Sequence, residues 1–342
     1  MRYPSSIRPG DTLGFVAPSF GCTIEPYKSA FGAALSRFHE MGYETRLGPN
    51  CYSDCGIGIS NTPKACGEEL TQYYCDDSID ALLSCGGGEC MCETLPYMDF
   101  DAMAAAKPKW YMGYSDNTNF TFLSNTLMDT AAIYGPCANE FGMEPWHKSI
   151  SDAWGILTGE VTSVHNYDGW EKDDDQGRTE ESPLAPYNIT EPYSQRVWAP
   201  QPDAPLTFEG RLIGGCVDCL VTLLGTRFDR ARAFAERYAD DGLIWFLECC
   251  DLNTMGIRRA MWQMREAGWF DHVRAFLIGR PLNGSEMFGT DQYAAVTDLL
   301  SPLGAPILMD LDIGHLSPMM PIISGAMARV AATAQTVEIS YL

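Results

Sequence analysis

Short apolar runs alternate with amphipathic stretches in the first part of the chain. Each run is followed closely by Pro, Ser or Gly, a pattern typical of buried strands. The expected strands are 12–19, 81–85 and 109–114. Phe31, Leu35 and Phe38 recur at helical spacing before Gly42, a candidate C-cap, and a further helix is expected from about Asn117. Strands separated by helices predict a parallel sheet with helices on its faces.

The last third of the chain repeats this alternation. The expected elements are an apolar stretch at 210–226 followed by a charged helix, strands at 243–248 and 273–281, a helix at 257–270, and a strand that runs into a turn within 305–318. At 342 residues the chain exceeds what one hydrophobic core usually supports. We therefore predict a two-domain α/β protein. Residues 1–165 form an N-terminal parallel-sheet domain of the flavodoxin or amidotransferase type, and residues 208–342 form a smaller C-terminal α/β domain.

The stretch 166–207 differs from both flanks because it is rich in acids and prolines and has no sustained periodicity. A segment of this length without periodic structure is typical of a linker or a binding loop. Its aromatic residues, which a solvated linker would normally lack, favour a loop that covers the substrate over a passive connector. These aromatic residues are Trp170, Tyr187, Tyr193 and Trp198.

Composition and charge exclude several classes of function. The net charge of −22 argues against nucleic acid or an anionic membrane as a partner, because phosphates would be repelled. No window approaches the roughly 18 uninterrupted apolar residues of a membrane span, and no secretory signal is visible, so we expect a cytoplasmic protein. Thirteen cysteines, an odd number, favour reduced thiols. Cys216 and Cys219 have the CxxC spacing of a zinc site, but no second pair of ligands follows at the distance such a site needs. We therefore expect no metal and no cofactor.

Three polar residues directly follow apolar runs: Ser115, Glu248 and His315. In parallel α/β sheets, ligands bind beyond the carboxyl ends of the strands, where these residues would lie. Taken singly, each is better explained by local structure: Ser115 as a helix cap, Glu248 as a strand end and His315 as a turn residue. Together they supply a nucleophile, an acid that orients a base, and the base that activates a serine hydroxyl.

The surroundings of Ser115 suggest an oxyanion hole. "GYSDN" is close to a nucleophile elbow but lacks the second glycine of G-x-S-x-G, which argues against the α/β-hydrolase fold itself. A helix that starts just after Ser115 would aim its free N–H groups at the reacting centre. The N–H of Asp116 and the backbone at Gly87 and Gly88 are therefore expected to hold the oxyanion.

Three other functions remain open on these residues alone. A cysteine amidotransferase could use Cys85 or Cys90, which flank the glycine turn. A binding protein could keep the same crevice with an inert triad. A dinucleotide-dependent enzyme is the least favoured, because no G-x-G-x-x-G follows the first strand.

Several segments spread over nearly the whole chain resemble peptidase family S66, which contains the LD-carboxypeptidases and the microcin C immunity proteins. These segments are "IRPGDTLGFVAPS", "GGECMCETLPYMDFD", "GYSDNT", "GRLIGGCVDCLVTLLGT", "FLE" and "DIGHLSPMMPIISG". The resemblance implies a serine peptidase with Ser115 as nucleophile, Glu248 as acid partner and His315 as base. It also implies two α/β domains, a site between them, and a homodimer.

Within the family, the long stretch 166–207 and "GRLIGGCVDCL" are more similar to the MccF-like, microcin C immunity branch. That resemblance implies an amidase that cuts a peptidyl-nucleotide between its terminal aspartate and the nucleotide. Trp170 or Trp198 would then stack on the base. The alternative branch removes D-alanine from an L,D-linked murein tetrapeptide. In either case the expected partner is a small peptide or peptidyl-nucleotide.

Overall fold

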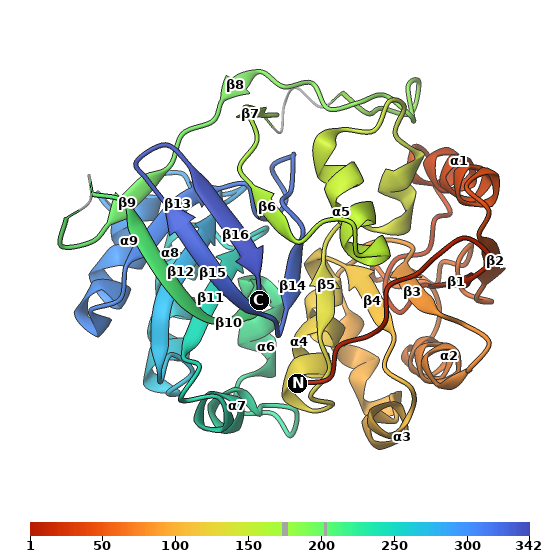
Figure 1. The fold of residues 1–342 in the computed structure, drawn as a ribbon, viewed down its shortest axis with the longest axis horizontal. Helices are drawn as coiled ribbons and strands as arrows, with labels where there is room; N and C mark the ends of the chain where they lie inside the picture. Colours follow the sequence, from red (N-terminus) through yellow and green to blue (C-terminus); the bar gives the residue numbers. More distant parts are fainter. Residues whose placement is uncertain (173–176, 202–203) are drawn as a thin grey trace.

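The computed structural model describes residues 1–172, 177–201 and 204–342, and it places two α/β halves side by side (Figure 1). The first half is built on a six-stranded sheet in the order β14-β5-β4-β3-β1-β2. Its strands are β1 (Thr12–Val16), β2 (Glu44–Leu47), β3 (Ala81–Ser84), β4 (Trp110–Gly113), β5 (Ala132–Tyr134) and β14 (Ile322–Ser324). Its helices are α1 (Tyr27–Glu40), α2 (Pro63–Cys75), α3 (Phe100–Ala105), α4 (Thr118–Thr126) and α5 (Lys148–Thr158).

The second half is built on an eight-stranded sheet in the order β6-β16-β15-β10-β11-β12-β13-β9. Its strands are β6 (Ser163–His165), β9 (Arg196–Trp198), β10 (Leu206–Cys216), β11 (Leu243–Glu248), β12 (Val273–Gly279), β13 (Ile307–Leu311), β15 (Met327–Ala332) and β16 (Val337–Tyr341). Its helices are α6 (Val217–Leu223), α7 (Ala231–Arg237), α8 (Thr254–Glu266) and α9 (Gln292–Leu300). Strands β10 to β13 run parallel, and the pairs outside them are antiparallel.

The predicted α/β class is confirmed, and the strand and helix ends follow local chemistry. Helix α1 stops where the apolar spacing ends, and Gly42 follows it with a φ of +88°, a left-handed conformation that glycine adopts at little cost. Strand β1 ends two residues before Pro18, which has no N–H to donate to a ladder. The strand expected to run into a turn within 305–318 is β13, which ends at Leu311 before the chain turns.

The two halves share strands and apolar cores. β14, from near the end of the chain, pairs antiparallel with β5, whereas β6 and β9 join the second sheet although they precede β10. Because the chain crosses between the two halves, the domain boundaries at 165 and 207 remain a prediction. Phe122 of α4 stacks on Trp269 after α8, with ring centroids 5.4 Å apart. Such shared packing holds the halves in a fixed relation.

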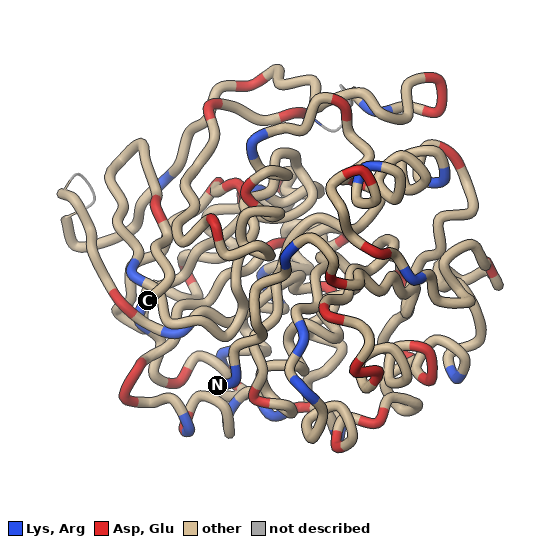
Figure 2. Tube along the Cα trace, turned by 45° about the vertical axis from the view of Figure 1, so that its right-hand side comes forward, with Lys and Arg blue, Asp and Glu red and all other residues tan. Residues whose placement is uncertain are grey.

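The described parts of the stretch 166–207 run over the top of both halves in Figure 1. It forms a small two-stranded sheet from β7 (Gly169–Trp170) and β8 (Glu191–Pro192) before it reaches β9. Residues 173–176 and 202–203 of this stretch lie outside the described residues. The 45 acidic and 23 basic residues of the sequence are spread along the trace, as Figure 2 shows for the described part of the chain. Within the described ranges, none of the helices combines the length and the apolar character that a membrane span requires.

Candidate active site

Ser115 is the first residue of the 3₁₀ helix η3 (Ser115–Asn117), in the tight turn that joins β4 to α4. Its φ of +61° is unusual for a residue with a side chain, and such strain is concentrated at functional sites. Gly113 allows the turn to close, because a Cβ there would stand 2.8 Å from Cγ of Asn117. The serine hydroxyl therefore sits at the tip of a strand, in the strand–turn–helix arrangement expected from the sequence.

The structure brings Ser115, His315 and Glu248 into one hydrogen-bonded chain. His315 Nε2 lies 2.9 Å from Ser115 Oγ, and His315 Nδ1 lies 2.9 Å from Glu248 Oε2. Glu248 is the last residue of β11, and His315 follows β13, so both project from the carboxyl ends of parallel strands. With Nδ1–H donated to the carboxylate, Nε2 is free to accept the serine proton.

A second layer of contacts holds Glu248. Tyr134, at the end of β5, donates its hydroxyl to Glu248 Oε1 at 2.5 Å and accepts the Ser115 N–H at 3.3 Å. Gly314 and Gly279 pack against the same side chain, since a Cβ on Gly314 would lie 2.6 Å from Glu248 Oε2. Sequence reasoning missed Tyr134, because a tyrosine that ends a short apolar run has no signature of its own.

Burial and charge act in opposite directions on this pair. Burial alone would raise the pKa of Glu248, but the His315 imidazolium and its hydrogen bond hold that pKa below the ordinary value. Burial alone would lower the pKa of His315, but the Glu248 carboxylate raises it well above the ordinary value. Glu248 thus makes His315 a stronger base.

The glycine turn after β3 lies beside the Ser115 hydroxyl. A Cβ on Gly87 would be 3.2 Å from Ser115 Oγ, and one on Gly88, whose φ is +129°, would be 2.0 Å from Ser19 Oγ. Within the described part of the chain, no acceptor is recorded for the N–H groups of Gly87, Gly88 and Asp116. Donors without a protein acceptor beside the nucleophile are what an oxyanion hole requires. Their role stays a prediction.

The Asp116 side chain is structural in its contacts. It is buried, accepts hydrogen bonds from the Ser19 hydroxyl and the Met91 N–H, and receives one from the Asn119 amide. Burial raises the pKa of Asp116, and these donors counteract the shift. The network fixes the turn that follows Ser115.

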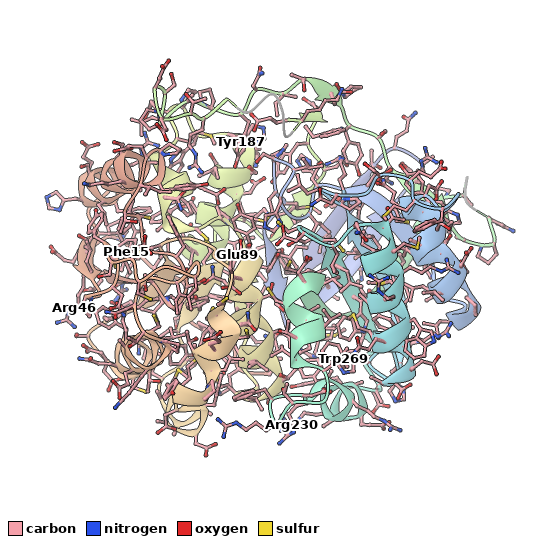
Figure 3. The ribbon with its side chains drawn as sticks, turned by 180° about the vertical axis from the view of Figure 1, so that it is seen from behind. Phe15, Arg46, Glu89, Tyr187, Arg230 and Trp269 are labelled. Carbon is pink, nitrogen blue, oxygen red and sulfur yellow. The ribbon has the colours of Figure 1, made fainter. Side chains whose placement is uncertain are left out.

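Two cavities meet at Ser115. The smaller, of about 180 Å³, is the acidic cavity. It is lined by Gly88, Glu89, Cys92, Ser115, Asp116, Asn119, Cys216, Asp218, Cys219, Thr222, Cys250 and Asp251. The larger, of about 380 Å³, is the aromatic cavity, and it contains His315 as well as Ser115. Its further lining includes Phe20, Tyr27, Tyr114, Asn139, Glu140 and Arg178. Glu89 lies near the middle of the molecule in Figure 3, where the halves meet.

The long stretch reaches these cavities through residues other than its tryptophans. Neither Trp170 nor Trp198 lines the two cavities that contain Ser115. Trp170 packs on the guanidinium of Arg280, 5.1 Å from its ring centre, and Trp198 stacks on Tyr293 at the edge of the second sheet. Arg178 extends into the aromatic cavity instead. The predicted stacking by either tryptophan thus stays without geometric support.

The thiols are unsuited to replace Ser115. Cys85 is fully buried, and burial raises its pKa well above the ordinary value, while burial also raises the pKa of Cys90. Thiolate, the reactive form, is therefore disfavoured at both. Cys216 and Cys219 are buried in the wall of the acidic cavity. No group of three or more His, Cys, Asp or Glu side chains in the described ranges could hold a metal ion.

An α/β scaffold with a serine, a histidine and a buried carboxylate in this arrangement is characteristic of serine hydrolases. Residues 13–135 match the LD-carboxypeptidase N-terminal domain, and residues 209–330 match the LD-carboxypeptidase C-terminal domain. The chain therefore belongs to peptidase family S66 and is a serine peptidase.

Relatives from both branches of the family resemble the chain. The probable murein peptide carboxypeptidase of Bacillus subtilis is 23% identical, over 98% of this chain and 93% of its own length. The microcin C7 self-immunity protein MccF of Escherichia coli is 26% identical, over 92% of this chain and 88% of its own. Among solved structures, an MccF-like protein from Bacillus anthracis superposes with a TM-score of 0.81 at 19% identity, covering both chains fully. MccF in complex with aspartyl sulfamoyl adenosine gives 0.79 at 22%, covering 98% of each.

Proposed function

We propose that the chain is an MccF-like serine amidase that hydrolyses a peptidyl-nucleotide or a related amide through Ser115, His315 and Glu248. The observation that carries the proposal is the continuous chain of two 2.9 Å contacts from the serine hydroxyl through the imidazole to a fully buried carboxylate. This arrangement supplies the base that a serine hydroxyl needs before it can act as a nucleophile.

The mechanism follows from these positions. His315 Nε2 takes the proton of Ser115 as Oγ attacks the scissile carbonyl, and Glu248 stabilises the imidazolium that forms. The N–H groups of Gly88 and Asp116, with the backbone of Gly87 beside them, stabilise the negative oxygen of the tetrahedral intermediate. Protonated His315 then gives its proton to the leaving amine, and a water that His315 activates hydrolyses the acyl-enzyme.

Two observations favour a peptidyl-nucleotide. The aromatic cavity beside Ser115 is large enough for a planar group and is lined by Phe20, Tyr27 and Tyr114. The similar MccF structures hold aspartyl sulfamoyl adenosine and adenosine monophosphate. The second candidate, removal of D-alanine from an L,D-linked murein tetrapeptide, is favoured by the murein peptide carboxypeptidase that matches nearly the whole chain. The homodimer, which the resemblance to the family implies, and the cytoplasmic location complete the proposal.

The test is hydrolysis of both substrates by the unmodified protein and by Ser115→Ala, followed by mass spectrometry. We expect serine-dependent cleavage of an aspartyl-nucleotide conjugate, with no more than background in Ser115→Ala. Release of D-alanine from the tetrapeptide alone would replace the first candidate with the second. If both proteins leave both substrates intact, or if Ser115→Ala cleaves as fast as the unmodified protein, the proposal is wrong.

A further inference from the structure

The two cavities that meet at Ser115 differ in their charged lining: Glu89 lines both, and the aromatic cavity adds Glu140 and the cation Arg178. Four carboxylates line the acidic cavity, and its described lining contains no lysine or arginine. The four are Glu89, Asp116, Asp218 and Asp251. An anionic group placed in that cavity would be repelled at short range, and the net charge of −22 adds to the repulsion. An anionic part of a substrate therefore needs a compensating cation, and the described lining offers an arginine only on the other side of Ser115.

Arg178 is the cation on that other side. It lies in the aromatic cavity with Ser115 and His315, and it comes from the long stretch 166–207 that crosses both halves. Its Nη1 donates to Asn139 Oδ1 at 3.0 Å, and its guanidinium lies 5.3 Å from the centre of the Tyr27 ring. These two contacts orient the planar group at the edge of the cavity.

Most of the donors of Arg178 remain available. A guanidinium carries five N–H donors, and the contact with Asn139 uses one. The ion pairs found among the described residues do not include Arg178. The nearby Glu140 is a buried carboxylate that accepts the Cys137 N–H at 2.9 Å and the Tyr114 hydroxyl at 3.4 Å. Burial raises the pKa of Glu140 and Arg178 opposes the rise, so the two interact through space without direct contact.

From this geometry we propose that Arg178 determines specificity by binding an anionic group of the substrate, either a carboxylate or a phosphate. This inference rests on the proposed amidase function and names the group that orients its substrate. A guanidinium suits both anions, because its fork of donors matches two oxygens at once. With the anion at Arg178, the scissile bond lies over Ser115, and the uncharged or cationic end faces the acidic cavity.

The test measures binding rather than turnover, in the full-length Ser115→Ala protein by calorimetry. One pair of probes is adenosine monophosphate and adenosine, which differ in a phosphate. The other pair is the L,D-linked murein tetrapeptide and its C-terminal amide, which differ in a carboxylate. We expect the anionic member of at least one pair to bind more tightly. Adding Arg178→Gln should weaken that anionic probe by about 10- to 100-fold, the usual effect of a lost charged hydrogen bond, and leave its neutral partner little changed.

Arg196 provides a matched control in the same stretch. It lies over the Tyr293 ring and near Asp310, away from both cavities, so Arg196→Gln should leave all four affinities unchanged. Arg178→Lys should recover part of the preference, because it keeps the charge and loses the fork. The inference is overturned if neither pair shows a charge preference, or if Arg178→Gln weakens charged and neutral probes equally or not at all. Failure of the proposed function would appear separately, as the absence of serine-dependent hydrolysis.

Discussion

Replacing Glu248 with glutamine tests the reasoning about the active site most directly. Glutamine has nearly the same shape, so the close packing against Gly279 and Gly314 is kept. Glu248 accepts two hydrogen bonds, from His315 Nδ1 at 2.9 Å and from the Tyr134 hydroxyl at 2.5 Å. An amide has one oxygen acceptor and one NH₂ donor, so it cannot satisfy both donors.

The expected magnitude follows from this mismatch. When the NH₂ faces Nδ1, the imidazole proton moves to Nε2, which then cannot take the proton of Ser115. A comparable substitution in a serine protease triad lowers kcat by roughly 10⁴-fold, and we expect a loss of that order for Glu248→Gln. The negative charge that raises the pKa of His315 is also lost, so this pKa should fall toward the ordinary value of about 6.5.

The assay is the pH dependence of kcat/KM for the unmodified protein and for Glu248→Gln. His315 must be neutral to act as a base, so activity should rise with pH through its pKa. In the unmodified protein this midpoint should lie above about 6.5, and in Glu248→Gln the residual activity should have a lower midpoint. Glu248→Ala, which also opens a cavity, separates lost charge from lost packing. An unchanged midpoint together with less than about a tenfold loss would refute the assigned role of Glu248.

Three further predictions concern residues around the triad. Tyr134→Phe should lower kcat, leave KM nearly constant and cost about 1.5–3 kcal/mol in urea unfolding, because a buried carboxylate loses a donor. Gly88→Ala should lower both stability and kcat, because its Cβ would stand 2.0 Å from Ser19 Oγ at a φ of +129°; a normal kcat in a folded variant would contradict an oxyanion role. Trp198→Ala should lower the urea midpoint and leave kcat/KM unchanged, because the indole stacks on Tyr293 outside both cavities. A rise in KM with an unchanged urea midpoint would instead indicate that Trp198 contacts the substrate.

The sequence predicted the positions that depend on local order along the chain. Ser115, Glu248 and His315 each follow an apolar run, and parallel strands bring their carboxyl ends to a common edge. Contacts between segments far apart in sequence were not predictable. Tyr134 is 114 positions from Glu248, and its partner is set by how the two sheets meet.

The contacts of the long stretch 166–207 were also not predictable from local sequence. Its aromatic content predicts that it is not a plain solvated linker, and in the structure Trp170 and Tyr193 both pack on Arg280. Composition cannot tell which side chain of the stretch faces the cavity. The tryptophans were the obvious candidates, yet Arg178 reaches it, since the direction of each side chain depends on strand pairing that has no local sequence signal.

The crossing of β14 into the first sheet has a consequence for synthesis of the protein. β14 pairs with β5, and the Ser324 hydroxyl and the Asn125 amide oxygen of α4 are hydrogen-bonded across 199 positions of sequence. During translation, β5 therefore stays an unpaired edge of the sheet that carries Ser115 until residue 324 has emerged from the ribosome. An open edge can pair with another chain, so slow or truncated synthesis should favour aggregation of partial products. The nucleophile is made early, but its surroundings are completed among the last steps of folding.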